Sequence, residues 1–166
     1  MDRAGLTQQL EALDPETFGW AMACCDRRRE EAEDVLHDVY VLVLEGRARF
    51  EGRSTLRTWI FGVIRRTAAA RRRREWLHAV IRLKVGRLDA APSPDEAAVA
   101  QDRLARTRSA MRRLSGRQRE VLHLVFYHAM TIEEAATIMK VSTGSARTHY
   151  HRGKAHMASL LSEDRP

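Results

Sequence analysis

The sequence predicts an all-α protein made of two small helical domains that a flexible acidic linker joins. Apolar residues recur at helical spacing along most of the chain, whereas strand-like alternation is scarce. The 166 residues are 44% hydrophobic, which is enough for two small cores. Charge changes in blocks: residues 1–45 hold 4 basic and 11 acidic groups, 46–87 hold 13 and 2, 88–102 hold 0 and 4, and 103–166 hold 12 and 5. We therefore place the domains at 1–87 and 103–166, with the linker at 88–102.

The charge balance indicates an anionic partner. The formal net charge is +7 and the pI is near 10.2, which is typical of nucleic-acid binding, although solubility alone is the plainer explanation. Two basic blocks separated by an acidic stretch indicate two nucleic-acid contacts on one chain. No stretch approaches the roughly 18 apolar residues of a membrane span, and the N-terminus lacks a signal-peptide pattern. We expect a cytoplasmic protein without membrane insertion.

The two cysteines, Cys24 and Cys25, are adjacent and cannot form a disulfide framework. A redox pair is the alternative, but two small core residues in a reduced compartment are the favoured interpretation.

Three helices are predicted in the first domain. Asp14 before Pro15 resembles an N-cap followed by proline at the first helical position. Gly46 is expected to end the second helix, and Ser54 to cap the long third helix. The first two helices span about 14–25 and 29–45, and the loop 47–53 precedes the third.

The second helix has two unlike faces. Its helical spacing predicts a buried stripe of Ala32, Val35, Leu36, Val39 and Val43. The other face mixes acidic and aliphatic side chains, which is typical of a protein-docking surface. An ordinary solvated face with incidental apolar residues is the alternative. We call this surface the acidic face, and it comprises Asp34, His37, Asp38, Val41, Leu44 and Glu45.

The third helix is predicted to bind nucleic acid through its outer side. Its inner stripe would be Leu56, Trp59, Ile60, Val63 and Thr67. Its outward residues would be Thr58, Phe61, Arg65 and Arg72. An exposed Phe61 among arginines suits unpaired bases, because the ring stacks while the arginines hold phosphates. Packing of Phe61 against the first helix is the alternative.

Four helices are predicted in the second domain. Ser115 is placed to cap the second of them, Thr131 with Glu134 forms a capping box for the third, and Ser142 starts the last. A short helix, a tight turn and a longer helix make the helix-turn-helix arrangement. The helices are expected at about 96–114, at 116–127, from 131 onward and at 142–161.

The last helix presents an apolar stripe and a polar face. Spacing of four and three residues aligns Ala146, Tyr150, Gly153, Met157 and Leu160 toward the core. The outward residues suit a DNA groove, since small residues allow close approach and polar ones reach bases or phosphates. They are Gly144, Arg147, Thr148, His151, Arg152 and Ala155. His149 lies at the edge of the stripe, where partial burial and a DNA contact remain equal alternatives.

The histidines of this helix do not have metal-ligand spacing. His149 and His151 diverge on the helix, and His149 and His156 lie about 10 Å apart along its axis. We expect no metal and no cofactor.

Three segments together resemble regions two and four of the extracytoplasmic-function (ECF) sigma factors of bacterial RNA polymerase. They are AEDVLHDVYVLVL (Ala32–Leu44), FEGRSTLRTWIFGVIRRTA (Phe50–Ala68) and the stretch Leu114–Leu161 that begins LSGRQREVLHL. The resemblance covers nearly the whole chain, and its motifs agree in order and spacing.

The resemblance implies a mechanism for the first domain. The acidic face would dock on the clamp helices of the largest polymerase subunit. The loop would capture a flipped base of the −10 element, and the long helix would hold the opened strand. The −10 residues implied are Arg47, Arg49, Phe50, Arg53, Ser54, Arg57, Thr58, Phe61, Arg65 and Arg72. His37 stands where many members carry glutamine, so its titration against Asp34 and Asp38 is a hypothesis for pH-sensitive docking.

For the second domain, the resemblance implies recognition of the −35 element in the major groove. Arg117 and Arg119 would contact the DNA backbone or the flap of the second-largest polymerase subunit. A separate anti-sigma factor is the usual regulator in such a family. The −35 residues implied are Ser142, Thr143, Gly144, Ser145, Arg147, Thr148, His149, His151 and Arg152.

Two other classes of function compete with this interpretation. A stand-alone helix-turn-helix regulator would dimerise and bind a two-fold operator with half-sites about one DNA turn apart. An enzyme is not expected, since the sequence has no Gly-rich phosphate loop, no metal-ligand spacing and no nucleophile with a placed base.

Overall fold

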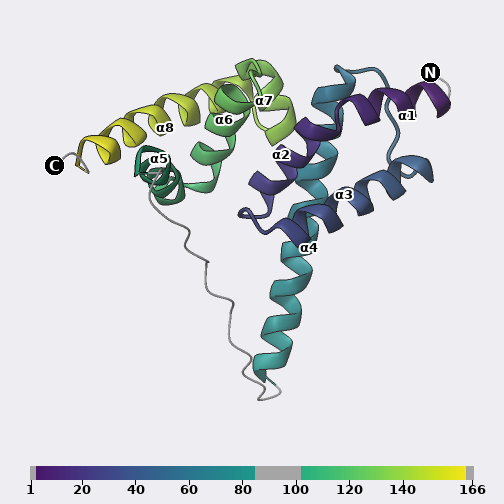
Figure 1. Cartoon of the computed structure of the whole chain (residues 1–166), viewed down its shortest axis with the longest axis horizontal. Coiled ribbons are helices and arrows are strands. Elements are labelled where there is room, and N and C mark those ends of the chain that lie inside the picture. The colour runs from purple at the N-terminus through teal and green to yellow at the C-terminus, as the bar shows by residue number, and fades with distance from the viewer. Residues whose placement is uncertain (1–2, 85–101, 164–166) are drawn as a thin grey trace. The chain divides into compact units, whose positions relative to one another are not determined.

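The computed structural model describes residues 3–84 and 102–163, and every regular element within these ranges is an α-helix (Figure 1). The chain divides into two compact units between Arg87 and Leu88, and each is described here by itself. The predicted all-α class is confirmed. None of the helices in the described ranges is both long and apolar enough to cross a membrane. The predicted linker lies outside the described residues except for Asp102.

The first unit contains one helix more than the sequence predicted. In the additional helix, α1, Leu10 is the one buried side chain among residues 5–12, and this weak apolar signal explains why the sequence did not predict the helix. The helices are α1 (Arg3–Ala12), α2 (Asp14–Cys24), α3 (Arg29–Leu44) and α4 (Leu56–Lys84).

Two of the predicted helix starts in this unit are wrong by one residue. Leu13, not Asp14, is the N-cap of α2, and the Asp14 carboxylate instead accepts a 2.8 Å hydrogen bond from the Tyr40 hydroxyl. Thr55, not Ser54, caps α4, because its Oγ1 accepts a 3.1 Å hydrogen bond from the Thr58 amide. The end of α3 is as predicted: Gly46 follows it with φ +70, in the left-handed region that glycine adopts without strain.

The buried stripe of α3 is confirmed at all five positions, Ala32, Val35, Leu36, Val39 and Val43. The prediction for α4 is partly wrong. Leu56, Trp59 and Thr67 are only half-buried, whereas Thr58 and Phe61, expected outside, are 2% and 0% exposed. Both α2 and α3 pack on α4, so two of its faces are covered and the buried arc is wider than one stripe.

Phe61 is part of the centre of this core. Its ring stacks on that of Trp20 from α2, with centroids 5.8 Å apart and an interplanar angle of 10°. The indole Nε1 of Trp20 also donates a 3.0 Å hydrogen bond to the Phe61 carbonyl, which satisfies the one polar atom of a buried ring system. The alternative interpretation of Phe61, packing against the first predicted helix, which is α2, is therefore confirmed.

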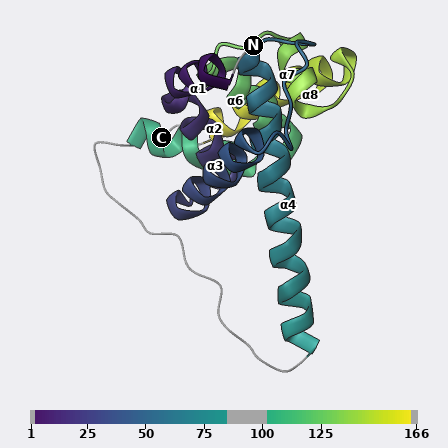
Figure 2. The ribbon, with the colours of Figure 1, turned by 90° about the vertical axis from the view of Figure 1, so that its right-hand side faces the viewer.

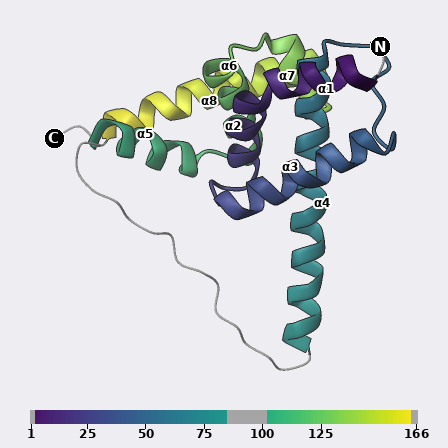
Figure 3. The same ribbon diagram turned by 45° about the vertical axis from the view of Figure 1, so that its right-hand side comes forward.

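The C-terminal part of α4 extends beyond the helices that pack on its first half. Figures 2 and 3 show this part continuing past α2 and α3. Every residue from Arg72 to His78 is exposed, in agreement with that view.

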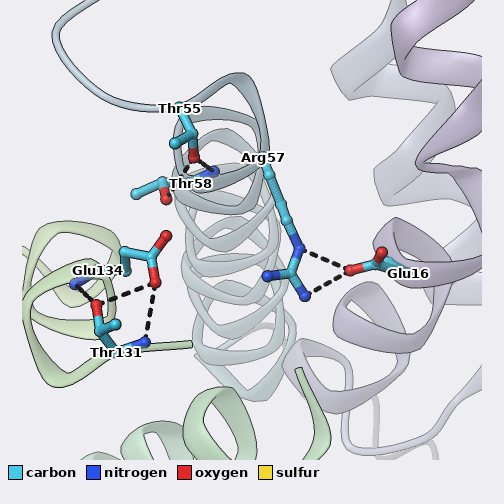
Figure 4. A network of polar contacts seen from close by, with 6 residues as sticks. All are labelled: Glu16, Thr55, Arg57, Thr58, Thr131 and Glu134. Atoms are coloured by element: carbon cyan, nitrogen blue, oxygen red, sulfur yellow. Dashed lines mark hydrogen bonds and ion pairs between the residues drawn. The ribbon is translucent and has the colours of Figure 1, made fainter. Parts of the chain in front are cut away.

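The second unit contains the four predicted helices: α5 (Asp102–Arg113), α6 (Gly116–Tyr127), α7 (Ile132–Met139) and α8 (Thr143–Glu163). The part of the first predicted helix at 96–101 lies outside the described residues. Ser115 caps α6 in a capping box with Gln118, and Thr131 caps α7 in one with Glu134, as Figure 4 shows for the second pair. Both boxes satisfy amides that a helix N-terminus leaves without intrahelical partners.

The apolar stripe of α8 packs inward as predicted. Ala146, Gly153 and Leu160 are buried, and Tyr150 and Met157 are half-buried. At Gly153 an added Cβ would lie 3.2 Å from Gln118 Cβ and 3.2 Å from Leu122 Cδ1, both on α6. Glycine therefore permits the close approach of these two helices, which holds the polar face of α8 outward.

Candidate protein and nucleic-acid interfaces

The acidic face of α3 is partly neutralised by an arginine from α4. Arg71 Nη2 lies 2.7 Å from Asp34 Oδ2, and Arg71 Nη1 lies 2.8 Å from Asp38 Oδ2. The hydrogen bond to Asp38 raises the pKa of Arg71, since it stabilises the charged guanidinium. Beside the two carboxylates the face exposes Leu44 at 46%. His37 and Glu45 are exposed as well, and Val41 is half-buried.

The loop between α3 and α4 places three arginines at the surface. Arg47 lies 3.3 Å from Glu45, Arg53 lies 3.0 Å from Glu51, and Arg49 Nε donates to the Gly46 carbonyl at 3.0 Å. Surface ion pairs of this kind contribute at most about 1 kcal/mol, so these arginines can exchange their partners for phosphates at little cost.

An aromatic contact joins this loop to the helix that follows. Half-buried Phe50 contacts Trp59 of α4, with ring centroids 5.5 Å apart and planes tilted by 57°. Ser54, next to the start of α4, is half-buried.

The predicted DNA residues of α4 do not form one exposed surface. Arg57 forms a 2.6 Å ion pair with Glu16 of α2 (Figure 4). Its guanidinium carbon also lies 5.7 Å from the centroid of the Phe61 ring. Arg65 is half-buried, whereas Arg72 is exposed and its Nη1 contacts the carbonyl oxygen of Cys24. Thr58 and Phe61 are buried and are removed from the predicted DNA surface.

The N-terminal part of α8 presents the expected polar face. The exposed residues are Gly144, Arg147, Thr148, His151 and Arg152. His149 is half-buried, which agrees with the alternative of partial burial for this residue. Local hydrogen bonds hold the start of this helix, where Ser142 Oγ accepts from the Ser145 amide at 3.1 Å. Thr148 Oγ1 donates to the Gly144 carbonyl at 3.0 Å. Of the remaining predicted residues, Ser142 and Ser145 are exposed and Thr143 is half-buried.

Arg117 connects two helices of this unit. Its Nη1 donates to the carbonyl of Met139, the last residue of α7, at 3.1 Å, and lies 3.2 Å from Glu120 Oε2. A cation at the C-terminus of α7 also complements the helix dipole. Arg119 is half-buried.

Two residues on α4 were not singled out from the sequence. Arg71 belongs to a run of four arginines, and only the packing of α3 on α4 distinguishes it from its neighbours. Trp76 is 65% exposed, and its position two residues after the arginine run, with Glu75 between, is the sequence signal that was available.

No metal centre emerges at these surfaces. In the described ranges, no three His, Cys, Asp or Glu side chains lie close enough together to hold a metal ion. Cys24 is half-buried, Cys25 is buried and both are free thiols.

Both units match known families in the predicted order. Residues 10–78 match Sigma-70 region 2, and residues 104–157 match Sigma-70, region 4. The ECF RNA polymerase sigma factor SigX of Bacillus subtilis is 30% identical over an alignment of 150 residues, which covers 81% of this chain and 75% of SigX. The chain belongs to the ECF RNA polymerase sigma factors.

A further relative agrees with this assignment, and two solved structures are similar in fold. The sigma factor is 26% identical to CnrH of Cupriavidus metallidurans, with 81% of this chain and 75% of CnrH covered. Among solved structures, it is similar in fold to the sigma factor RpoE in complex with the anti-sigma factor NepR from Bartonella quintana. That likeness has a TM-score of 0.74 at 24% identity and covers 96% of this chain and 98% of RpoE. The fold of CnrH in complex with the cytosolic domain of CnrY is also similar, with a TM-score of 0.68 at 20% identity, covering 99% and 92%.

Proposed function

We propose that this ECF sigma factor binds bacterial core RNA polymerase, recognises −35 and −10 promoter elements, and initiates transcription of a specific regulon. The observation that carries the proposal is the presence, in one chain, of two family regions with unlike surfaces. The region 2 match holds an acidic face and an arginine-rich loop, and the region 4 match holds a helix-turn-helix with a polar exposed face. In this proposal residues 1–87 dock and open DNA, residues 103–166 recognise the −35 element, and 88–102 link them.

The acidic face is the proposed site for the polymerase clamp helices. It combines charged groups at its rim with an exposed aliphatic residue, Leu44, which is the composition of a protein interface. Because Arg71 already holds two of the carboxylates, the face is presented as an ordered array and not as independent side chains. The proposed docking residues are Asp34, His37, Asp38, Val41, Leu44 and Glu45.

The loop 47–53 and the exposed side of α4 are the proposed site for the −10 element. Exposed arginines bind phosphates, and Phe50 lies among them where a flipped base would enter. Burial of Thr58 and Phe61 reduces the proposed set. It becomes Arg47, Arg49, Phe50, Arg53, Ser54, Arg57, Arg65 and Arg72.

The start of α8 is the proposed site for the −35 element. Exposed Arg147 and Arg152 are suited to guanines or phosphates, and Thr148 and His151 to hydrogen bonds. Ser142, Thr143, Gly144, Ser145 and His149 complete the proposed set. Arg117 and Arg119 are proposed to contact the DNA backbone or the polymerase flap.

The remaining expectations follow from the proposed role. A sigma factor works where polymerase works, so we propose a cytoplasmic location and no enzymatic activity of its own. Since RpoE and CnrH have been solved with NepR and with the cytosolic domain of CnrY, we propose an anti-sigma factor as a further partner.

Run-off transcription tests the proposed function. Purified core polymerase and this chain are incubated with a template pool in which the −35 and −10 positions are randomised. We expect transcripts that require the chain and templates enriched for two unlike elements. Absence of both chain-dependent transcripts and core binding would reject the proposal. Enrichment of a two-fold operator without core binding would instead support a stand-alone regulator.

A further inference from the structure

The exposed C-terminal part of α4 carries a tryptophan, Trp76, that is not covered by the core of the first unit. Trp76 is 65% exposed, whereas Trp20 in the same unit is 1% exposed. Arg72 contacts the carbonyl of Cys24, the last residue of α2, so Trp76 lies one helical turn past the end of α2. Figures 1 and 2 show that no other helix of the first unit accompanies α4 there. A surface tryptophan of this exposure is a candidate for contact with a partner.

The charges around Trp76 identify the class of that partner. Arg72 and Arg73 precede it by four and three residues, so a helix places them on the side of the indole. The segment 71–78 holds four arginines and one acidic residue, Glu75, which leaves three positive charges. Arg71 forms ion pairs with Asp34 and Asp38. The other three arginines, 72 to 74, lie on the exposed part of α4. An exposed aromatic side chain next to arginines is the combination that binds unpaired bases and their phosphates.

We propose that Trp76 stacks on an unpaired base of the opened promoter strand while Arg72 and Arg73 bind the adjacent phosphates. This inference rests on the proposed function, because promoter opening supplies the single strand. It transfers to Trp76 the stacking role that buried Phe61 cannot perform. Trp76 lies twenty residues past Leu56, where α4 begins after the loop 47–53, and this is about 30 Å along the helix axis. It therefore reaches a different nucleotide from the one at the loop.

A protein partner fits this surface less well. Leu77, which is 49% exposed, is the one other large apolar side chain among the exposed residues 72–78. The centres of protein interfaces are depleted in charged residues, whereas Trp76 lies directly beside arginines. Stacking on a base leaves the guanidinium groups free to remain paired with phosphates, so none of them is buried without a counter-charge.

Binding of a labelled single strand by the full-length chain tests the inference. The probe is a fluorescein-labelled twelve-nucleotide oligothymidylate, measured by anisotropy at low salt, with a duplex of the same length as the second arm. Trp76→Ala is compared with Trp76→Phe, which keeps an aromatic face, and with Leu77→Ala, which removes the neighbouring apolar side chain. Circular dichroism verifies that α4 is retained in each variant.

We expect Trp76→Ala to weaken oligothymidylate binding about tenfold. Trp76→Phe should recover most of that loss, and Leu77→Ala should bind like the wild type. Duplex binding should change little in all three. The inference would be overturned if Trp76→Ala bound the single strand with wild-type affinity. If Trp76→Ala bound the single strand normally but lost binding to core polymerase, the surface would be a protein interface instead. If the wild-type chain supports run-off transcription and Trp76→Ala binds the single strand normally, this inference alone fails. If the wild-type chain does not support transcription but its single-strand binding depends on Trp76, the proposed function fails instead.

Discussion

Arg71 of α4 donates a 2.8 Å hydrogen bond to the carboxylate of Asp38 on α3, and the same guanidinium reaches Asp34. The contact joins the two helices whose surfaces are proposed to carry out different tasks. It therefore links the geometry of the docking face to that of the DNA-binding helix.

The first prediction concerns the stability that this contact supplies. Arg71→Met removes two partly exposed ion pairs, and we expect a loss of about 1 kcal/mol from the first unit. The loss should shrink when Asp34 and Asp38 are already asparagine, because the partners are then gone. Thermal unfolding followed by circular dichroism measures it, with Arg73→Met as the control on an exposed position of the same helix. Equal losses in both backgrounds would mean that Arg71 stabilises the unit in some other way.

A second prediction uses two glycines of α8. Gly153→Ala should destabilise the second unit by about 1–3 kcal/mol, because its Cβ would lie 3.2 Å from Gln118 Cβ, an atom close to a backbone that cannot easily move. Gly144→Ala is the matched control, since its nearest atom is 3.9 Å away and alanine favours a helix. Urea unfolding should rank Gly153→Ala below the wild type and Gly144→Ala at or above it. The reverse order would contradict the packing of α6 on α8.

The third prediction concerns the turn between α6 and α7. Ala129 is exposed and has φ +49, a left-handed conformation that costs a residue with a Cβ roughly 1–2 kcal/mol. Ala129→Gly should therefore raise the melting temperature of the second unit by a few degrees, with the greater flexibility of glycine in the unfolded chain offsetting part of the gain. A lower melting temperature would show that the turn does not hold Ala129 in this conformation.

The fourth prediction follows from the surroundings of Cys25. Burial, with a smaller contribution from Glu31, raises the pKa of its thiol, so less thiolate is present at any pH below that pKa. Iodoacetamide at pH 8 should consequently modify half-buried Cys24 faster than Cys25 in the folded chain. Both should react alike in urea, and peptide mass spectrometry distinguishes the two sites. Faster modification of Cys25 would contradict its burial.

The buried positions of α3 were predictable from the sequence, and those of α4 were only partly so. The α3 stripe of Ala32, Val35, Leu36, Val39 and Val43 was correct because its buried residues follow helical spacing, although α2 and α4 both pack on this helix. On α4, packing by both α2 and α3 buries Thr58 and Phe61, and no periodicity in α4 alone contains that information.

Contacts between residues close in the sequence could be predicted, whereas contacts between different helices could not. The cap at Ser115 and the capping box of Thr131 with Glu134 depend on residues three positions apart, so the sequence predicts them. The pairing of Arg71 with Asp38 joins residues 33 positions apart. The sequence does not indicate which of the four successive arginines forms this contact.

The last prediction separates the tasks of the two units. Asp34→Ala with Asp38→Ala should weaken binding to core polymerase while leaving −35 recognition intact. Arg152→Ala with Thr148→Ala should weaken −35 recognition while leaving core binding intact, because these side chains are exposed on α8 and each lost base contact costs about 1–3 kcal/mol.

The most direct test measures the affinity of core RNA polymerase for these two double variants beside the wild type, using fluorescently labelled chains. We expect a loss on the order of tenfold or more for the Asp34/Asp38 double variant, since the substitutions remove both carboxylates from the acidic face. We expect wild-type affinity for the Thr148/Arg152 double variant. Equal affinities for the two variants, whether both weakened or both unchanged, would contradict the division of labour between the units.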